Sequence, residues 1–259
     1  MKLTIYQIDA FSEEPFKGNP AAIVPLKSWL PDLTLQSIAE ENNLSETAFF
    51  VPNDIGFHIR WFTPKNEVEL CGHATLASAY VIFNILNYNS DKVHLNSQSG
   101  RLSVSCSGDL LTLDFPSQKP EKCDIPKQLL NGLNKMPISC YKSEDYLAVF
   151  KNEKEILDIN PDFNELKKLD LRGIIITAKG SDYDFVSRFF VPKYGIDEDP
   201  VTGSAHTQLT PFWSEKLGKK KMSARQISRR GGNLICEQKD DRVFISGKAV
   251  KYFEGEINI

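Results

Sequence analysis

The chain repeats itself, and this internal repeat constrains its fold more than any other feature of the sequence. The pentapeptide RWFTP at 60–64 returns as RFFVP at 188–192. Soon after each copy comes a glycine followed by small residues and an apolar run, starting at Cys71 in the first half and at Thr202 in the second. Self-similarity of this kind predicts that the chain contains two copies of one supersecondary unit.

The other segments of the two halves also correspond in order. ETAFFV at 46–51 aligns with RGIIIT at 172–177, and the stretch at 99–115 aligns with the stretch at 231–247. These segments alternate apolar and polar residues, or are rich in β-branched and aromatic residues, as strands are. We therefore expect each half to contain, in order, strand, strand, loop, helix, strand and hairpin.

The expected helix at 73–86, HATLASAYVIFNIL, is apolar at nearly every position. A helix that is apolar all round is buried all round, so strands are expected to surround it. The predicted fold class is α+β, with two pseudo-twofold-related domains, each a mostly antiparallel β-barrel or roll around a central buried helix. The Pro- and Lys-rich stretch at 116–128 is the expected linker. It gives domains at 1–118 and 119–259, with terminal segments free to cross between them.

Composition argues against several classes of protein. The net charge of -3 and the isoelectric point of about 5.9 do not fit a basic nucleic-acid-binding face. Residues 1–16 alternate as a strand does and lack the apolar core of a signal peptide. No stretch approaches the ~18 apolar residues of a membrane span. The 5 cysteines are odd in number and form no CxxC pair, which predicts a cytoplasmic protein with reduced thiols.

The N-termini of the two buried helices are expected to face the cleft between the domains. A helix N-terminus presents unpaired N–H groups and a positive dipole, so the pair would suit a carboxylate or another anion. Gly72 and Gly203 would let a ligand approach the backbone closely there. The nearby residues that can carry chemistry are Cys71, His73, Asp199, Thr202, Ser204 and His206.

Glu46 is a further candidate, because it stands where a loop changes into an apolar strand. Its neighbours Ala48, Phe49 and Phe50 predict a dry environment for its carboxyl group. Burial raises the pKa of a carboxyl group, which suits it to transferring protons near neutral pH. The alternative interpretation is a glutamate at the start of a strand that points into solvent.

Four segments in this order resemble the PhzF-like isomerases of phenazine biosynthesis, a family similar to diaminopimelate epimerase in fold. They are GNPAAIV at 18–24, SETAFF at 45–50, FTPKNEVELCGHATLASA at 62–79 and DEDPVTGSAH at 197–206. The resemblance extends from about residue 6 to residue 257. It implies two matching barrels, each wrapped round a central helix, an active site in the cleft, no cofactor, no metal, and a homodimer.

The resemblance also assigns roles to residues of this chain. Glu46 would be the acid/base that moves a proton between carbons of a small carboxylated substrate, in the best-known case a dihydro-hydroxyanthranilate. His73, Asp199 and Ser204 would line the site and orient the substrate. Gly72 and Gly203 would contribute backbone N–H groups, while Thr202 and His206 are weaker candidates.

Several alternatives stay open at this point. A two-thiol racemase or epimerase needs a thiol at both helix N-termini, yet the repeat matches Cys71 with Thr202. Metal-dependent hydrolysis through Cys71, His73 and His206 has no HExxH-like spacing to support it. A serine hydrolase would need a GxSxG motif around Ser204, which is absent. A non-catalytic ligand-binding protein on the same scaffold is the remaining reading, since a fold does not fix a function. The substrate and the part played by Cys71 are not predicted.

Overall fold

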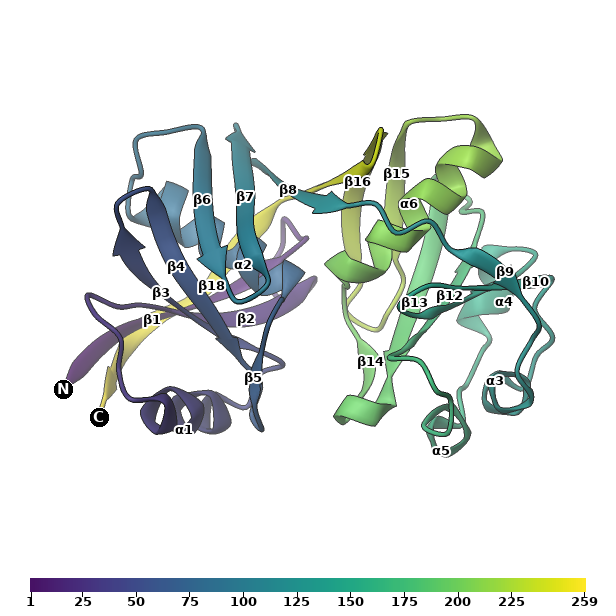
Figure 1. Cartoon of the computed structure of the whole chain (residues 1–259), viewed down its shortest axis with the longest axis horizontal. Coiled ribbons are helices and arrows are strands. Elements are labelled where there is room, and N and C mark those ends of the chain that lie inside the picture. Colours follow the sequence, from purple (N-terminus) through teal and green to yellow (C-terminus); the bar gives the residue numbers. More distant parts are fainter. The chain divides into compact units, whose positions relative to one another are not determined.

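The computed structural model describes residues 1–259 and divides into two compact units (Figure 1). Unit 1 comprises Met1–Asp114 together with Ser246–Ile259, and unit 2 comprises Phe115–Ile245. The sequence analysis gave 119–259 to the second domain but allowed terminal segments to cross, and in the structure residues 246–259 belong to unit 1. The reason is that strand β18 (Ala249–Asn258) pairs antiparallel with the whole length of β1 (Lys2–Ala10).

Unit 1 is a mixed sheet with two α-helices. In it β2 pairs with β3 and β4 pairs with β6 in parallel, while β1–β2, β3–β4, β4–β5, β6–β7 and β7–β8 are antiparallel. Its further elements are β2 (Asn19–Pro25), α1 (Asp32–Asn42), β3 (Thr47–Asn53), β4 (Gly56–Phe62), β5 (Glu67–Val68), α2 (Gly72–Tyr80), a π-helical turn (Val81–Ile85), β6 (Lys92–Ser97), β7 (Gly100–Ser107) and β8 (Leu110–Pro116).

Unit 2 repeats this pairing pattern strand for strand. The pairs β11–β12 and β13–β15 are parallel, and β10–β11, β12–β13, β13–β14 and β15–β16 are antiparallel. Its elements are β9 (Glu121–Cys123), α3 (Lys127–Leu133), β10 (Ser139–Lys142), β11 (Tyr146–Val149), α4 (Glu153–Leu157), α5 (Phe163–Leu166), β12 (Ile174–Ala178), β13 (Phe185–Val191), a 3-10 turn (Pro192–Tyr194), β14 (Ile196–Asp199), α6 (Gly203–Leu217), β15 (Lys221–Gln226), β16 (Gly232–Lys239) and β17 (Arg242–Gly247).

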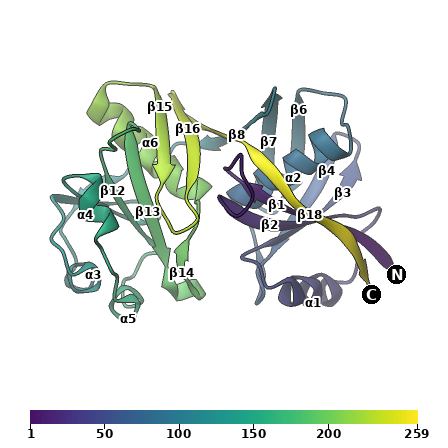
Figure 2. The ribbon, with the colours of Figure 1, turned by 180° about the vertical axis from the view of Figure 1, so that it is seen from behind.

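Each unit holds one helix that is buried among its strands. In α2 every side chain from His73 to Ala79 is buried, and the helix packs against β1, β2, β3 and β18 (Figure 2). In unit 2, α6 packs against β15 and β16. The chain therefore has the predicted mixed α+β fold, and α2 and α6 occupy corresponding positions in the sequence of the two halves. The pseudo-twofold relation between the halves stays a prediction.

An arginine pairs with a glutamate at the same place in both halves. Arg60 in β4 donates two hydrogen bonds to the carboxylate of Glu67 in β5, both at 2.7 Å. Arg188 in β13 does the same to Glu198 in β14, at 2.7 and 2.9 Å. A bidentate pair of this kind fixes geometry as well as adding stability. It therefore fixes the hairpin that leads into each central helix.

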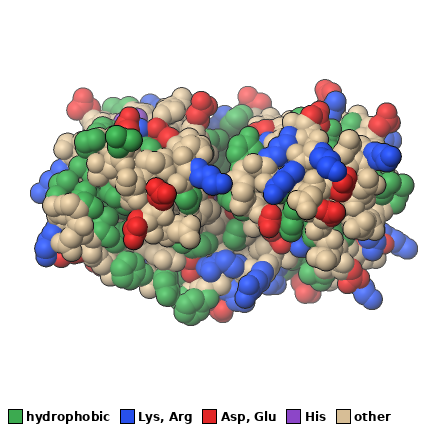
Figure 3. Space-filling model, turned by 90° about the horizontal axis from the view of Figure 1, so that it is seen from below, with side chains coloured by type: hydrophobic (Ala, Val, Ile, Leu, Met, Phe, Trp, Pro, Cys, Tyr) green, Lys and Arg blue, Asp and Glu red, His purple; other side chains and the backbone are tan.

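Side chains of both charges occur on the face of the molecule that Figure 3 shows. On the face shown in Figure 3, the Lys and Arg side chains are interspersed with those of Asp and Glu. This distribution agrees with the small net charge of -3. None of the helices combines the length and the apolar character needed to span a membrane.

Candidate active site

In unit 1 the structure brings together Glu46, Cys71 and His73. Cys71 is the extended N-cap residue of α2, Gly72 is the first residue of that helix, and Glu46 directly precedes β3. His73 Nε2 lies 3.3 Å from Glu46 Oε2, and His73 Nδ1 lies 3.5 Å from Cys71 Sγ. The imidazole ring thus stands between the carboxyl group and the thiol, and all three groups are largely buried.

The same three groups are close enough to raise the question of a metal ion. Their donor atoms lie within 4.8 Å of one another. However, His73 presents Nδ1 to the thiol and Nε2 to the carboxylate. A single ion bonds only one nitrogen of an imidazole ring, and the three residues offer one donor atom each within that distance, so their spacing fits an ion as well as a chain of contacts. The metal-dependent alternative of the sequence analysis combined Cys71 and His73 with His206. In the structure the third residue of the group is Glu46.

His73 is neutral under ordinary conditions. Burial lowers the pKa of its imidazole to about 3, so the contact with Glu46 is not an ion pair at neutral pH. A neutral imidazole carries one N–H and has one nitrogen that accepts. The 3.3 Å contact with Glu46 is close but is not a hydrogen bond in the structure. Once the two side chains align, His73 with its proton on Nε2 would donate to an ionised Glu46, and with its proton on Nδ1 it would accept from a protonated Glu46. One tautomer of His73 therefore suits each protonation state of Glu46.

The N-termini of α2 and α6 are not capped by the side chains that precede them. Neither Cys71 nor Thr202 makes a side-chain hydrogen bond to the first turn of its helix. Gly72 and Gly203 are the first residues of these helices. The unpaired N–H groups of a first turn, together with the helix dipole, favour an anion. Each helix thus begins as an anion-binding N-terminus does.

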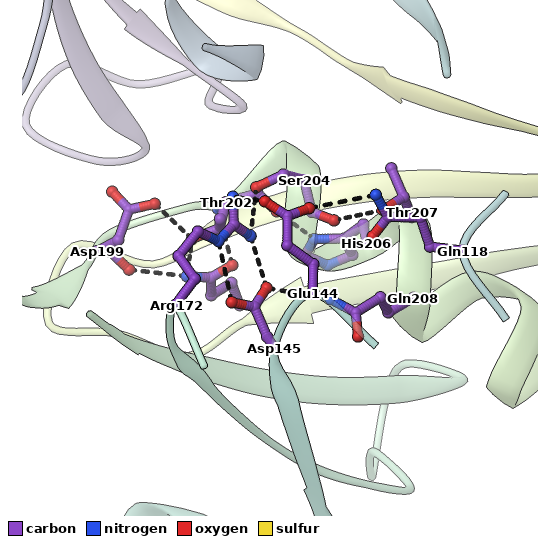
Figure 4. A network of polar contacts seen from close by, with 11 residues as sticks. Gln118, Glu144, Asp145, Arg172, Asp199, Thr202, Ser204, His206, Thr207 and Gln208 are labelled. Carbon is purple, nitrogen blue, oxygen red and sulfur yellow. Dashed lines mark hydrogen bonds and ion pairs between the residues drawn. The ribbon is translucent and has the colours of Figure 1, made fainter. Parts of the chain in front are cut away.

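In unit 2, Asp199 is held by two residues, one of which the sequence analysis missed. The Thr202 hydroxyl donates to Asp199 Oδ2 (Figure 4). Gln226, at the end of β15, donates from Nε2 to the Asp199 carbonyl at 2.7 Å and accepts from Thr202 N at 2.9 Å. Gln226 is fully buried. A polar residue at an inward position of the alternating strand 221–226 is the signal that could have found it.

The second residue that the sequence analysis missed is Arg172. Its NH2 group donates to the Ser204 hydroxyl at 3.1 Å, and Nε donates to Asp145 Oδ1 at 2.9 Å (Figure 4). Asp145 is fully buried, and Nη1 of the guanidinium lies 2.9 Å from Glu144 Oε1. Because a guanidinium only donates, Ser204 accepts from it and keeps its own O–H for another acceptor. The strand register makes Gly173 the counterpart of Glu46 and Arg172 that of Ser45, one position away from the alignment of 46–51 with 172–177.

His206 has a structural partner inside its own helix. Its Nδ1 lies 2.7 Å from the Thr202 carbonyl, which only accepts, so Nδ1 carries the proton. Burial lowers the pKa of His206 to about 4, and its ring lies 6.0 Å from that of Phe185. Thr75 makes the equivalent contact in α2, donating its hydroxyl to the Cys71 carbonyl. His206 therefore fastens the first turn of α6.

A cavity of about 530 Å³ opens elsewhere in unit 1, beside α1 and the end of β18. Leu33, Ile38 and Ile257 are among its lining residues, and none of the predicted site residues is. Its walls are mostly apolar and hold no set of acid, base and nucleophile. The chemistry of the side chains, rather than the size of a cavity, thus identifies the candidate site.

Comparison with known proteins gives one consistent result. The PhzC-PhzF family, described as phenazine biosynthesis-like protein, matches residues 8–255. The chain is 51% identical, over 259 residues and 100% of both chains, to an uncharacterized isomerase of Pseudomonas aeruginosa. It is 44% identical over 262 residues, 99% of both chains, to an uncharacterized isomerase of Halalkalibacterium halodurans.

Solved structures agree with this result. A crystal structure of a phenazine biosynthesis protein of the PhzF family from Enterococcus faecalis is 47% identical, with a TM-score of 0.98 and coverage of 100% of both chains. A hydroxyproline epimerase from Agrobacterium vitis is 8% identical, with a TM-score of 0.64 over 99% of this chain and 92% of that one. At that identity the likeness concerns the fold alone. The chain belongs to the PhzC-PhzF family of phenazine biosynthesis-like proteins and is an isomerase of that family.

Proposed function

We propose that the protein moves a proton between two carbons of a small carboxylated substrate without a cofactor, and that Glu46 is the general acid/base. The observation that carries this proposal is the 3.3 Å contact between Glu46 and a buried His73. A group that takes and returns a proton needs a neighbour that tolerates both of its protonation states. Neutral His73 is such a neighbour, because exchanging its tautomer serves a carboxylate and a carboxylic acid in turn.

In the first step, Glu46 accepts a proton from a carbon made acidic by an adjacent carboxylate or conjugated system. In the second step, it returns that proton to another carbon of the same substrate, so atoms and charge balance. The uncapped N-termini of α2 and α6 and the Ser204 hydroxyl would stabilise the negative charge that develops between the steps. Asp199, fixed by Thr202 and Gln226, would orient the substrate.

The repeat favours one base over two. A racemase of the two-base kind needs a proton acceptor on each face of the substrate carbon. The counterpart of Glu46 in the strand register is Gly173, which has no side chain to act as a base. The counterpart of Cys71 is Thr202, whose hydroxyl is a poor base. We therefore propose that the proton leaves and returns on one face of the substrate, as in a shift along a conjugated system.

Two further features implied by the family resemblance belong to this proposal. One is that the predicted site residues of unit 1 and those of unit 2 act on the same substrate, which remains a prediction. So do the homodimer and the cytoplasmic location.

Deuterium exchange tests the proposal. The protein is incubated in D₂O with a panel of cyclic and amino-acid carboxylates, and deuterium at carbon is followed by NMR and mass spectrometry. Native protein should introduce deuterium into a substrate of the panel, and Glu46→Gln should not. Glu41→Gln, an exposed change on α1, is the matched control and should behave as native. Exchange by Glu46→Gln at the native rate would show that another group is the base. Saturable binding with no exchange would favour the ligand-binding alternative.

A further inference from the structure

Two cysteines of unit 2 lie opposite each other in neighbouring strands, outside the candidate active site. Strands β9 and β10 are antiparallel, and their register pairs Cys123 with Cys140. Residues directly opposite in an antiparallel pair have Cα atoms roughly 4.5 to 5.5 Å apart, and their side chains leave the same face of the sheet. Disulfides span Cα separations of about 4.4 to 6.8 Å. The backbone of this strand pair therefore already meets the requirement for a disulfide bond.

The side chains of the two cysteines meet as well. Both pack in the apolar cluster of unit 2 that includes Leu129 and Tyr146. The Cys123 sulfur is close enough to the Cys140 thiol to raise its pKa, and Cys140 Sγ also contacts the Tyr141 carbonyl at 3.8 Å. Both cysteines are free in the structure.

The other strand cysteines of the chain do not share this arrangement. The register of β15 and β16 places Cys236 opposite Met222. The register of β7 and β8 places Cys106 opposite Leu111. Cys123 and Cys140 thus differ from both in having a second thiol across the strand pair.

We propose that Cys123 and Cys140 are an oxidative modification site, at which a peroxide converts the two thiols into a cross-strand disulfide. Cys123 is half-buried and Cys140 is buried, so the peroxide reaches Cys123 first. The Cys123 sulfur attacks the O–O bond, giving a sulfenic acid and one water molecule. The Cys140 sulfur then displaces the hydroxyl group as a second water molecule, forming the S–S bond. Forming the disulfide removes two electrons from the two sulfurs, and the peroxide accepts both of them.

The second step is expected to be slow. Burial, together with the neighbouring Cys123 sulfur, raises the pKa of the Cys140 thiol to about 12. The thiolate is the reactive form of cysteine, and it is scarce for such a group. The modification is therefore a response to sustained exposure to peroxide rather than a rapid catalytic cycle.

The position of the pair gives the modification a structural consequence. β9 is the first strand of unit 2, just after the chain leaves unit 1 at Asp114. The disulfide would close the segment that carries α3 and tie β9 covalently to β10. Closing a loop restricts the unfolded chain, so the oxidised form should unfold at a higher temperature than the reduced form.

Thiol counting on the full chain tests this inference. The native protein is treated with hydrogen peroxide, unfolded and alkylated, and the blocked thiols are counted by mass spectrometry. The number of alkylated cysteines should fall from 5 to 3, and dithiothreitol should restore all of them. Digestion should yield one linked peptide pair that contains Cys123 and Cys140. The melting temperature should rise on oxidation and return on reduction.

Matched variants complete the test. Cys123→Ser and Cys140→Ser should each abolish the linked peptide, while Cys106→Ser should leave it unchanged. Five free thiols after prolonged oxidation of the native protein would overturn the proposal, as would a linked peptide pair that joins different cysteines. Because the native protein alone gives either result, a variant that fails to fold does not weaken the test. The outcome is also independent of the role proposed for Glu46.

Discussion

Glu46 and His73 lie 3.3 Å apart, and the histidine of this pair is neutral. Its pKa of about 3 in the folded protein is below the ordinary value of 6.5. As the pH falls below the ordinary value, the unfolded chain therefore binds a proton that the folded chain does not. His73 thus contributes to the free energy of unfolding above that pH, and its contribution is lost progressively as the pH falls towards about 3.

We expect this loss to be measurable between about pH 7.5 and about pH 5, where it amounts to roughly 2 kcal/mol for one such histidine. Urea unfolding at both pH values gives the difference for the native protein and for His73→Gln. The variant should show a smaller difference by about that amount, whatever its stability at the higher pH. Equal differences in the two proteins would mean that His73 is not held neutral by its surroundings.

The Cys71 thiol is a neighbour of the reacting group rather than the group itself. We expect Cys71→Ala to keep deuterium exchange within about tenfold of the native rate, because the contact of the thiol with His73 Nδ1 is a weak one. Glu46→Gln should lose about 10²- to 10⁴-fold in the same assay. A comparable loss in Cys71→Ala would show that the Cys71 thiol takes part in the proton transfer.

The Ser204 hydroxyl is expected to act on the substrate and to contribute little to stability. Arg172 stays held by Asp145 when the hydroxyl is removed, so Ser204→Ala should change the free energy of unfolding by less than about 1 kcal/mol. Exchange should fall about 10²-fold, since one donor to the developing charge is lost. Thr207→Val removes a hydroxyl from the same helix and should leave exchange near the native rate. Equal losses in the two variants would point to a general effect on α6.

Arg172 and Asp145 are expected to be strongly coupled in stability. The Asp145 carboxylate is fully buried, so Arg172→Met leaves a buried charge without its cation. We expect this variant to lose roughly 3 kcal/mol in the free energy of unfolding. Adding Asp145→Asn to it should restore part of the loss, because a neutral amide replaces the unpaired charge. A double variant less stable than Arg172→Met would contradict the pairing.

The sequence predicted the repeat and the buried helix because both depend on local patterns. Matching segments recur in order, and the apolar run that begins at Ala74 leaves no polar face to expose. The family resemblance predicted that Glu46 and the first turn of α2 line the same site. It did not predict their direct contact. The repeat also shows in the structure as equal strand pairing in the two units.

Other features depend on pairings that leave no local trace. β18 has no buried residue and no regular alternation, so its place beside β1 could not be read from residues 249–258. A lone arginine such as Arg172 ahead of an apolar strand is usually a solvated residue. Only the fold brings it to Asp145, which stands at the start of a different strand. Gln226 belongs to no motif and shows its role only through its partners.

The pairing of β1 with β18 also has a consequence for synthesis of the chain. Residues 115–245 lie between the two parts of unit 1, so unit 2 leaves the ribosome before β18 has been made. β1 must wait for its partner strand while a whole second unit is translated. A product that stops short of β18 would present β1 as an uncovered edge, which invites pairing with other chains. Unit 1 is therefore completed only after the whole of unit 2 has been made, by the pairing of β18 with β1.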